Sequence, residues 1–298
     1  MDIGGTTIKF AVVADNGTIE KKWHINTDTE NNGQNIMAAI VDSVKYNIDR
    51  HSPEYKGIGV GVPGPVENGV VTQAVNLGWG STPVQTLLED KLGLTTAVVN
   101  DANAAALGEL WQGSKNRVND LLFVTLGTGV GGGVVVDGKI LNGSHSAGGE
   151  IGHIPVQSDQ QRICGCGNIN CLETYTSASG MITTMNDLIK DTEMAKVNNA
   201  KEIFDRARKN DTYAKETITR TINCLASAIA GIINTIDPQE IVIGGGVAEA
   251  GDIFLKPLKT EINTHAFPRI KNNFNLRKAT LGNDAGVLGA VYQSMQSR

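Results

Sequence analysis

The sequence predicts an α/β protein built of two lobes. With 298 residues the chain is long enough for about two domains with buried cores. Short β-branched runs alternate with amphipathic stretches, and this alternation is typical of sheets covered by helices. The segment LGTGVGGGVVV also echoes the opening DIGGTTIKFAVV, which indicates an internal duplication. We therefore expect two related lobes with a ligand cleft between them.

The first lobe is expected to open with a β-hairpin. The runs Ile8–Ala14 and Ile19–Asn26 read as strands, and the turn Asp15-Asn16-Gly17 joins them. An amphipathic helix follows over Gln34–Asp49, because isoleucine or valine recurs there every fourth residue. The other elements expected here are strands at 57–62 and 95–100 and helices at 83–92 and 102–111.

The second lobe is expected to begin with another glycine-linked strand pair and to be richer in helices. Its expected elements are strands at 121–126, 132–136 and 240–243 and helices at 213–236, 248–264 and 285–295. No linker rich in proline or serine divides the lobes, and the closing helix is expected to return to the first one. The domains predicted are a small one at 1–112 joined by 285–298, and a large one at 113–284 that contains the loop 153–171.

Charge and composition restrict the class of partner. The net charge is −5 and no basic run interrupts the chain, which excludes a nucleic-acid surface or an anionic membrane surface. No apolar run approaches the roughly 20 residues that span a bilayer, and no secretion signal is visible. We therefore expect a cytoplasmic protein that acts on a small molecule.

Three glycine clusters offer backbone amides to a ligand. Glycine turns let N–H groups approach phosphate oxygens without a Cβ in the way. In DIGGTT the threonine hydroxyls add donors, Asp2 could hold Mg²⁺, and Lys9 lies near enough to help. The second loop places Thr128 equivalently, so the two loops could grip a polyphosphate from both sides. Taken singly, each loop could equally be an ordinary hairpin turn, and IVIGGGV could admit an adenosine or be only a crowded strand-to-helix turn.

Four metal-ligating side chains lie close together in the sequence. His153, Cys164, Cys166 and Cys171 are the number and types of ligand that a closed tetrahedral zinc site takes. No position remains open for water, so such a zinc would be structural. The alternative is three free cysteines beside an unrelated histidine, which would leave a cytosolic cluster of oxidisable thiols. Cys224 lies in the middle of a helix and is expected to be core.

Three acidic residues are candidates for chemistry. Asp101 lies between a strand and a helix, where it could cap the helix or point into a cleft, and capping is the more common role. Glu150 precedes His153 by three residues and Glu173 follows Cys171 by two, so both are expected beside the metal. Paired acceptors of this kind suit vicinal sugar hydroxyls. From the residues alone, either role stays open.

Together these motifs resemble the ROK family of sugar kinases and repressors. The match spans nearly the whole chain, and its most specific part is EIGHIPVQSDQQRICGCGNINCLE, similar to the family's zinc signature. DIGGTT, GVPGPV, NDANAAALGE, LGTGVGGG and IVIGGGV follow in family order. Two departures stand out. Asn170 replaces the usual glycine, and only Met1 precedes Asp2, so the first strand is expected to be clipped and the role of Asp2 is less secure.

The resemblance implies a two-lobed actin-like (ribonuclease H-like) ATPase fold and an ATP- and Mg²⁺-dependent sugar kinase with one structural Zn²⁺. Asp101 would be the general base that deprotonates the sugar's 6-hydroxyl as it attacks the γ-phosphate. The residues expected to bind the sugar are Gly64, Asn76, Asn100, Asp101, Glu150, His153 and Glu173. The residues expected to bind the nucleotide and its Mg²⁺ are Asp2, Gly4, Gly5, Thr6, Thr7, Lys9, Thr128, Gly129, Gly245 and Gly246.

Glucose is the favoured substrate, because CLETYTSASGM resembles the glucokinase branch of the family. The alternatives are N-acetylmannosamine, N-acetylglucosamine, fructose, mannose and allose. A sugar-responsive repressor of the same family would carry a DNA-binding segment that this chain does not show, and a chaperone-like ATPase would lack the zinc loop. A homodimer or higher homo-oligomer is expected.

Overall fold

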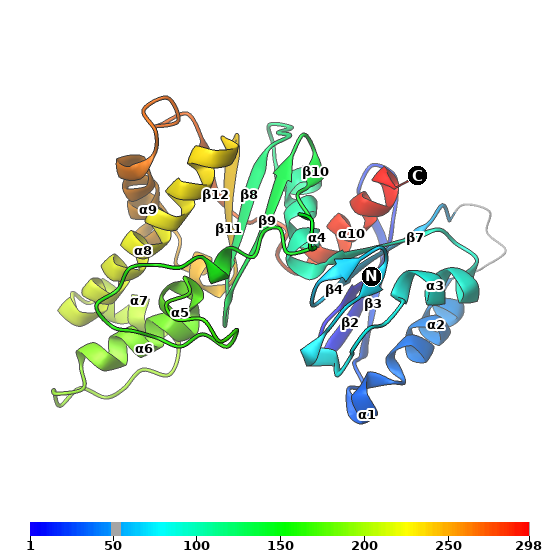
Figure 1. Ribbon diagram of the computed structural model, residues 1–298, viewed down its shortest axis with the longest axis horizontal. Coiled ribbons are helices and arrows are strands. Elements are labelled where there is room, and N and C mark those ends of the chain that lie inside the picture. The colour runs from blue at the N-terminus through cyan, green and yellow to red at the C-terminus, as the bar shows by residue number, and fades with distance from the viewer. Residues whose placement is uncertain (49–54, 298) are drawn as a thin grey trace. The chain divides into compact units, whose positions relative to one another are not determined.

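The computed structural model describes residues 1–48 and 55–297 (Figure 1). The chain forms two compact units. Unit 1 comprises Met1–Arg117, Lys139–Gly148 and Leu281–Arg298, and unit 2 comprises Val118–Gly138 and Gly149–Thr280. The domain boundaries expected from the sequence remain a prediction. Asp49, the expected end of the first long helix, and residue 298 lie outside the described residues.

Unit 1 is built on a five-stranded mixed sheet of order β3-β2-β1-β4-β7. The central strand β1 runs antiparallel to β2 and parallel to β4, and β4 runs parallel to β7. The carboxyl ends of β1, β4 and β7 therefore lie at one edge of the sheet, where ligands bind in open α/β sheets. The strands are β1 (Asp2–Ile3), β2 (Thr7–Val13), β3 (Ile19–Asn26), β4 (Ile58–Val62) and β7 (Thr96–Asn100).

The helices of unit 1 bury an apolar core that includes Ile8 and Phe10 of β2 and Ile36 and Ile40 of the first long helix. The main helices are α2 (Ile36–Asn47), α3 (Val84–Leu92), α4 (Asp101–Gly108) and α10 (Ala285–Gln296). The short elements are α1 (Glu30–Gly33), β5 (Val66–Glu67), β6 (Val70–Val71), η1 (Val75–Leu77), η2 (Glu109–Gly113), β10 (Lys139–Ile140) and η5 (Gly282–Asp284).

Helices α4 and α10 pack backbone to backbone. A Cβ built on Gly289 of α10 would overlap the backbone oxygen of Ala104 in α4, so this contact is open only to glycine. The contact fixes the C-terminal helix against the helix that begins at Asp101. The closing segment therefore packs within unit 1.

Unit 2 repeats the sheet plan of unit 1. Its strands lie in the order β9-β8-β11-β12, with β9 antiparallel to β8 and with β8, β11 and β12 parallel. The same hairpin-plus-parallel arrangement in both units agrees with the echo seen in the sequence. The strands are β8 (Leu121–Leu126), β9 (Val130–Val136), β11 (Glu240–Gly244) and β12 (Asn275–Lys278).

Helices cover the sheet of unit 2 and carry its larger apolar core, which includes Leu225 and Ile229 of α8 (Figure 1). The α-helices are α5 (Glu173–Thr176), α6 (Ala178–Leu188), α7 (Ala200–Arg208), α8 (Thr212–Ile236) and α9 (Asp252–His265). Two 3₁₀ turns are η3 (Ile151–His153) and η4 (Gly246–Ala250). Within the described residues, we find no helix with the length and apolar character needed to cross a membrane.

Most expected elements are confirmed within a few residues, and two expected helices are wrong in detail. The one expected at 248–264 is divided by Gly251, whose φ of 70° lies outside the helical region, into η4 and α9. The one expected at 102–111 begins at Asp101 and changes to a π-helical turn at Glu109. Helices α6 and α7 and strand β12 were not expected.

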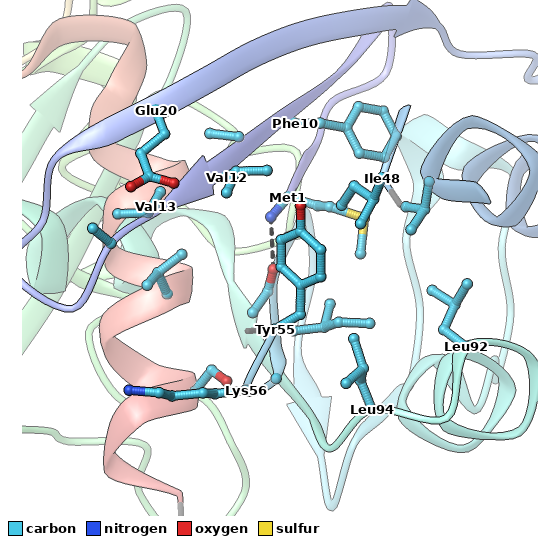
Figure 2. A pocket seen from close by; sticks show the side chains of 18 of the residues that line it. Met1, Phe10, Val12, Val13, Glu20, Ile48, Tyr55, Lys56, Leu92 and Leu94 are labelled. Carbon is cyan, nitrogen blue, oxygen red and sulfur yellow. Dashed lines mark hydrogen bonds between the residues drawn. The ribbon is translucent and has the colours of Figure 1, made fainter. Parts of the chain in front are cut away.

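A cavity of about 680 Å³ lies in unit 1 beside the chain's first residue. The side chains of Phe10, Ile48, Tyr55 and Leu92 line it (Figure 2). The Met1 amino group donates a hydrogen bond to the Gly59 oxygen at 2.6 Å, and burial lowers the pKa of this amine to about 6. None of the predicted site residues lines this cavity, so it is separate from the candidate site.

The close contact between α4 and α10 predicts that adding one methyl group at Gly289 strongly destabilises the fold. Gly289→Ala should lower the free energy of unfolding by about 2 kcal/mol or more, because backbone cannot move away as a flexible side chain can. Gly231→Ala is the matched control, since Gly231 lies in helix α8 with open space around its Cβ position; it should stabilise by about 0.5–1 kcal/mol. Equal melting temperatures for the two variants would contradict the packing.

Candidate functional site

The first glycine loop, between β1 and β2, is held by hydrogen bonds from Thr27 and is partly exposed to solvent. Thr27 holds it by donating from its amide to the Thr6 oxygen at 3.0 Å and from its hydroxyl to the Gly4 oxygen at 2.6 Å. Gly5 and Thr6 are exposed. The loop therefore presents amides and a hydroxyl to solvent in a fixed conformation. Thr27 was not expected, and only its position just past a strand end could have indicated it.

Asp2 lies beside this loop and keeps a partly accessible carboxylate. Its Oδ2 is 3.8 Å from Nζ of Lys9, its side chain is 20% exposed, and Lys9 in turn reaches Oδ1 of Asn283 at 3.5 Å. The first turn of α10 also touches Asp2, since a Cβ on Gly286 would lie 3.0 Å from the carboxylate. The positive end of a helix dipole stabilises an anion there. Asp2 can therefore offer an oxygen to a divalent cation.

The end of β7 separates the roles of two adjacent residues. Asn100, not Asp101, is the N-cap of α4: its Oδ1 accepts hydrogen bonds from the amides of Ala102 at 2.9 Å and Asn103 at 3.2 Å. Asp101 is the first helical residue, with Oδ1 accepting from the Ala102 amide at 2.8 Å. The interpretation of Asp101 as the helix cap is therefore wrong. Its carboxylate is exposed and retains accepting capacity.

The environment of Asp101 favours its protonated form. Desolvation by the surrounding protein raises the pKa of Asp101 above the ordinary value for aspartate, and the negative charge of Asp2 adds to this effect. The hydrogen bonds from Ala102 and Asn100 oppose it. The side chain is open to solvent, yet enough protein lies around it to weaken its hydration. A carboxylate held in this way is more basic than a free one, which suits a general base.

Two further predicted residues lie near these groups in unit 1. Nδ2 of Asn100 donates to the Gly64 oxygen at 3.2 Å, which links the turn after β4 to the end of β7. Exposed Asn76, in the turn η1, lies next to Gly5. A Cβ built on Gly5 would be 3.3 Å from the backbone oxygen of Asn76. Unit 1 thus brings its glycine loop to Asn76, and Asn100 to Gly64.

In unit 2 the second glycine loop meets Glu173. The Val130 amide donates to Oε2 of Glu173 at 3.4 Å. A Cβ on Gly129 would lie 2.7 Å from the same oxygen, so glycine is needed for this approach. Thr128 is exposed at the tip of the loop. The third glycine cluster, which includes Gly245 and Gly246, packs against the end of β8. A Cβ on Gly245 (φ 80°) would overlap the backbone of Leu126, whereas a Cβ on Gly246 would face open space.

The four expected metal ligands converge. The ligand atoms of His153, Cys164, Cys166 and Cys171 all lie within 4.8 Å of one another. Nδ1 of His153 is 3.6 Å from Sγ of Cys164, and Sγ of Cys166 is 3.6 Å from Sγ of Cys171. Tetrahedral zinc with Zn–S near ~2.3 Å and Zn–N near ~2.0 Å implies S–S and S–N separations of about 3.5–3.8 Å. The donor set therefore fits a structural zinc ion.

The surroundings of the cluster connect the cysteines to the acids. Oε1 of Glu173 accepts from the Cys164 thiol at 2.9 Å. Burial raises the pKa of Cys164 to about 12, while a backbone hydrogen bond lowers that of exposed Cys166. Nε2 of His153 points away from the thiols and lies 3.9 Å from Oε2 of Glu150, whose side chain is 54% exposed. Glu150 and Glu173 therefore both lie beside the donor cluster, the first next to His153 and the second next to Cys164.

These features define the class of protein. A hairpin-led mixed sheet, repeated in both units with glycine loops at the strand turns, is the actin-like ATPase fold expected from the sequence. Residues 1–296 match the ROK family, and the chain belongs to this family.

Individual relatives sharpen this assignment. A glucokinase from Halalkalibacterium halodurans is 41% identical over 303 residues, which cover 97% of this chain and 92% of the relative. A glucokinase from Thermotoga maritima is 33% identical, with 98% and 95% covered. The crystal structure of a ROK family glucokinase from Streptomyces griseus, in complex with glucose and AMPPNP, is similar with a TM-score of 0.77 at 29% identity, covering 99% of this chain and 98% of that one.

The convergence of the four ligands predicts the metal content of the protein. Cys166→Ser should reduce zinc from one per chain to well below half, measured by elemental analysis after dialysis, because an alcohol does not replace a thiolate ligand. Cys224→Ser is the control, since Cys224 lies in α8 outside the cluster; it should keep the metal. Full zinc occupancy in Cys166→Ser would show that the ligand set is wrong.

Proposed function

We propose that this protein is an ATP-dependent glucokinase, which transfers the γ-phosphate of ATP to the 6-hydroxyl of glucose. Membership of the ROK family and the glucokinases among its relatives support this proposal. The observation that carries it is the difference in role between Asn100 and Asp101 at the end of β7. Asn100 caps the helix, and Asp101 is left with an accessible carboxylate of raised pKa.

Asp101 is the proposed general base. It would accept the proton of the sugar's 6-hydroxyl as the oxygen attacks the γ-phosphate. Phosphoryl transfer needs positioning, charge neutralisation and a base near the nucleophile, with little covalent chemistry from the protein. A pKa above that of ordinary aspartate increases the affinity of Asp101 for this proton.

The glycine loops are the proposed phosphate sites. On unit 1 the donors are the amide of exposed Gly5 and the hydroxyls of Thr6 and Thr7, while the Gly4 amide holds the turn by donating to the Thr7 oxygen at 3.0 Å. On unit 2 the donors are offered by Thr128 and Gly129. Gly245 and Gly246 are proposed to accept the adenosine. Mg²⁺ would neutralise phosphate charge, with Asp2 as its protein ligand and Lys9 as an additional cation beside it.

The sugar contacts are assigned to residues of both units. Glu150, His153 and Glu173 would accept or donate hydrogen bonds to hydroxyls from unit 2. In unit 1, Gly64, Asn76 and Asn100 are weaker assignments. The Asn100 side chain already caps α4 through Oδ1, and its Nδ2 group donates to the Gly64 oxygen and to Asp101, which limits what it can offer a sugar.

Zinc has a supporting role in this proposal. The ion would be held by His153, Cys164, Cys166 and Cys171 and would supply no chemistry to the reaction. With Nδ1 of His153 on the ligand cluster, Nε2 is left on the side of Glu150, where it can meet a hydroxyl. The expected cytoplasmic location and homo-oligomeric assembly remain predictions.

A panel of sugars tests the proposed function. ADP release should be measured with glucose, mannose, fructose, allose, N-acetylglucosamine and N-acetylmannosamine, each with ATP and Mg²⁺. Glucose should give the highest kcat/KM, and omission of Mg²⁺ should abolish turnover. A higher kcat/KM for an N-acetylated sugar or fructose would move the substrate to that alternative. No ADP release with any of the six would contradict the kinase assignment.

A further inference from the structure

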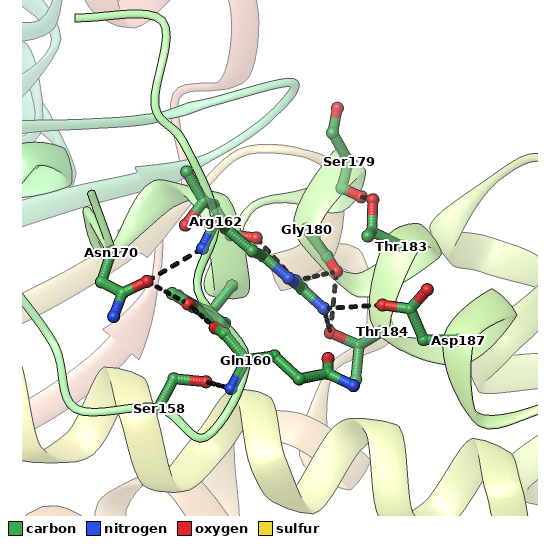
Figure 3. Close-up of polar contacts among 11 residues, drawn as sticks. Ser158, Gln160, Arg162, Asn170, Ser179, Gly180, Thr183, Thr184 and Asp187 are labelled. Atoms are coloured by element: carbon green, nitrogen blue, oxygen red, sulfur yellow. Dashed lines mark hydrogen bonds and ion pairs between the residues drawn. The ribbon is translucent and has the colours of Figure 1, made fainter. Parts of the chain in front are cut away.

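The turn at Asn170 does more than reverse the chain. Asn170 adopts a left-handed conformation with φ 61°, which glycine would adopt without strain. Its Oδ1 accepts a hydrogen bond from the Arg162 amide at 2.9 Å and another from the Tyr175 hydroxyl at 2.6 Å (Figure 3). Glycine would allow the same turn but would make neither bond. The asparagine therefore adds contacts that the backbone conformation does not require.

The side chain of Arg162 extends this network to two helices. Nη1 donates to the Thr174 oxygen in α5 at 2.7 Å and to the Gly180 oxygen in α6 at 3.2 Å (Figure 3). Nη2 donates to the Thr184 hydroxyl at 3.0 Å and lies 3.4 Å from Oδ2 of Asp187. These are charge-assisted bonds from a side chain that is only 12% exposed. Arg162 therefore joins the loop to α5 and α6.

Tyr175 completes the network between the two residues. The Arg162 guanidinium lies over its ring at 4.7 Å. The Gln160 oxygen is a second acceptor beside the Tyr175 hydroxyl, so it shares the single hydroxyl hydrogen with Oδ1 of Asn170. We call Arg162, Asn170 and Tyr175 the polar brace. None of the three is a metal ligand, yet Arg162 precedes Cys164 by two residues and Asn170 immediately precedes Cys171. The brace and the ligand cluster thus hold the same loop by different contacts.

The brace also reaches the residue that matters for the sugar. Thr174, whose oxygen accepts from Arg162, follows Glu173 directly, and both lie in the first turn of α5. Glu173 is otherwise held by the Cys164 thiol and the Val130 amide. The Cys164 thiol can donate to Glu173 only in the zinc-free protein, because a zinc-bound thiolate has no proton to donate. The brace needs no change of protonation and ties α5 to the loop in both states.

We propose that the polar brace is a second, metal-independent lock on the zinc loop, and that it positions Glu173 for the sugar when zinc is absent. This proposal rests on the proposed function, because it takes Glu173 as a sugar ligand. It predicts that zinc and the brace act redundantly: either one alone keeps the sugar site, and loss of both destroys it.

The experiment compares glucose affinity with and without zinc. Wild type, Asn170→Gly and the control Asn168→Ala are each measured by calorimetry, as the zinc-loaded protein and after chelation. Asn168 lies in the same loop and its side chain takes no part in the brace. Asn170→Gly keeps the left-handed turn accessible, so it tests the side-chain bonds and not the fold. Arg162→Met removes the helix contacts as a second, stronger variant.

The expected result is an interaction between zinc and the brace. With zinc, Asn170→Gly should bind glucose within about twofold of wild type. After chelation, wild type should weaken by less than about tenfold. Asn170→Gly should weaken by at least a further tenfold, since the Arg162 amide loses its acceptor and Tyr175 is no longer tied to residue 170. Asn168→Ala should follow wild type in both states.

Two outcomes would overturn the proposal. One is equal glucose affinity of chelated wild type and chelated Asn170→Gly, and the other is complete loss of glucose binding in chelated wild type. Hydrogen exchange of amides 160–177 gives a readout that needs no sugar: in the chelated protein, Asn170→Gly should exchange faster there than wild type. If zinc-loaded wild type binds no glucose, the proposed function fails, and unchanged exchange would then reject the brace as well.

Discussion

The capping of α4 by Asn100 is the interaction on which the proposed chemistry depends. A helix that begins at the carboxyl end of a buried strand needs partners for its first amides, and an aspartate at this place would normally supply them. Because the Asn100 side chain accepts from the Ala102 and Asn103 amides, Asp101 makes a single short backbone contact and remains accessible. Desolvation by the surrounding protein then raises the pKa of Asp101, whereas the hydrogen bond from the helix amide of Ala102 opposes this shift.

Glycine at points of close contact builds the rest of the scaffold. Gly289 allows α10 to pack on α4, and Gly129 allows Glu173 to approach the second glycine loop.

The raised pKa of Asp101 also affects the stability of the fold. Because the pKa is higher in the folded than in the unfolded protein, ionised Asp101 destabilises the folded state. Its contribution to stability therefore becomes less favourable as pH rises from the unfolded to the folded pKa value. The site therefore costs stability at neutral pH, which is common where function determines a residue.

The sequence was sufficient for the repeated sheets, the convergence of His153 with three cysteines, and the family, because these depend on local patterns such as β-branched runs ending in glycine and the spacing of the cysteines. It was not sufficient for Thr27 or Arg162, whose roles depend on contacts with residues far along the chain or on another helix. It also left the role of Asp101 open between helix cap and cleft residue, since two adjacent polar residues compete for one cap and only the structure decides between them. The division of the helix at Gly251 was missed because a single glycine is tolerated inside many helices.

The pH dependence of kcat at saturating glucose and MgATP, measured for wild type and Asp101→Asn, tests the central claim most directly. Asp101→Asn should lower kcat by about 10²-fold or more, with glucose affinity largely kept and stability at neutral pH not reduced. Wild type should show an acid limb whose midpoint lies above the ordinary aspartate value of about 3.9, because the base must be ionised. Turnover by Asp101→Asn within a few-fold of wild type would contradict the assignment of Asp101 as the base.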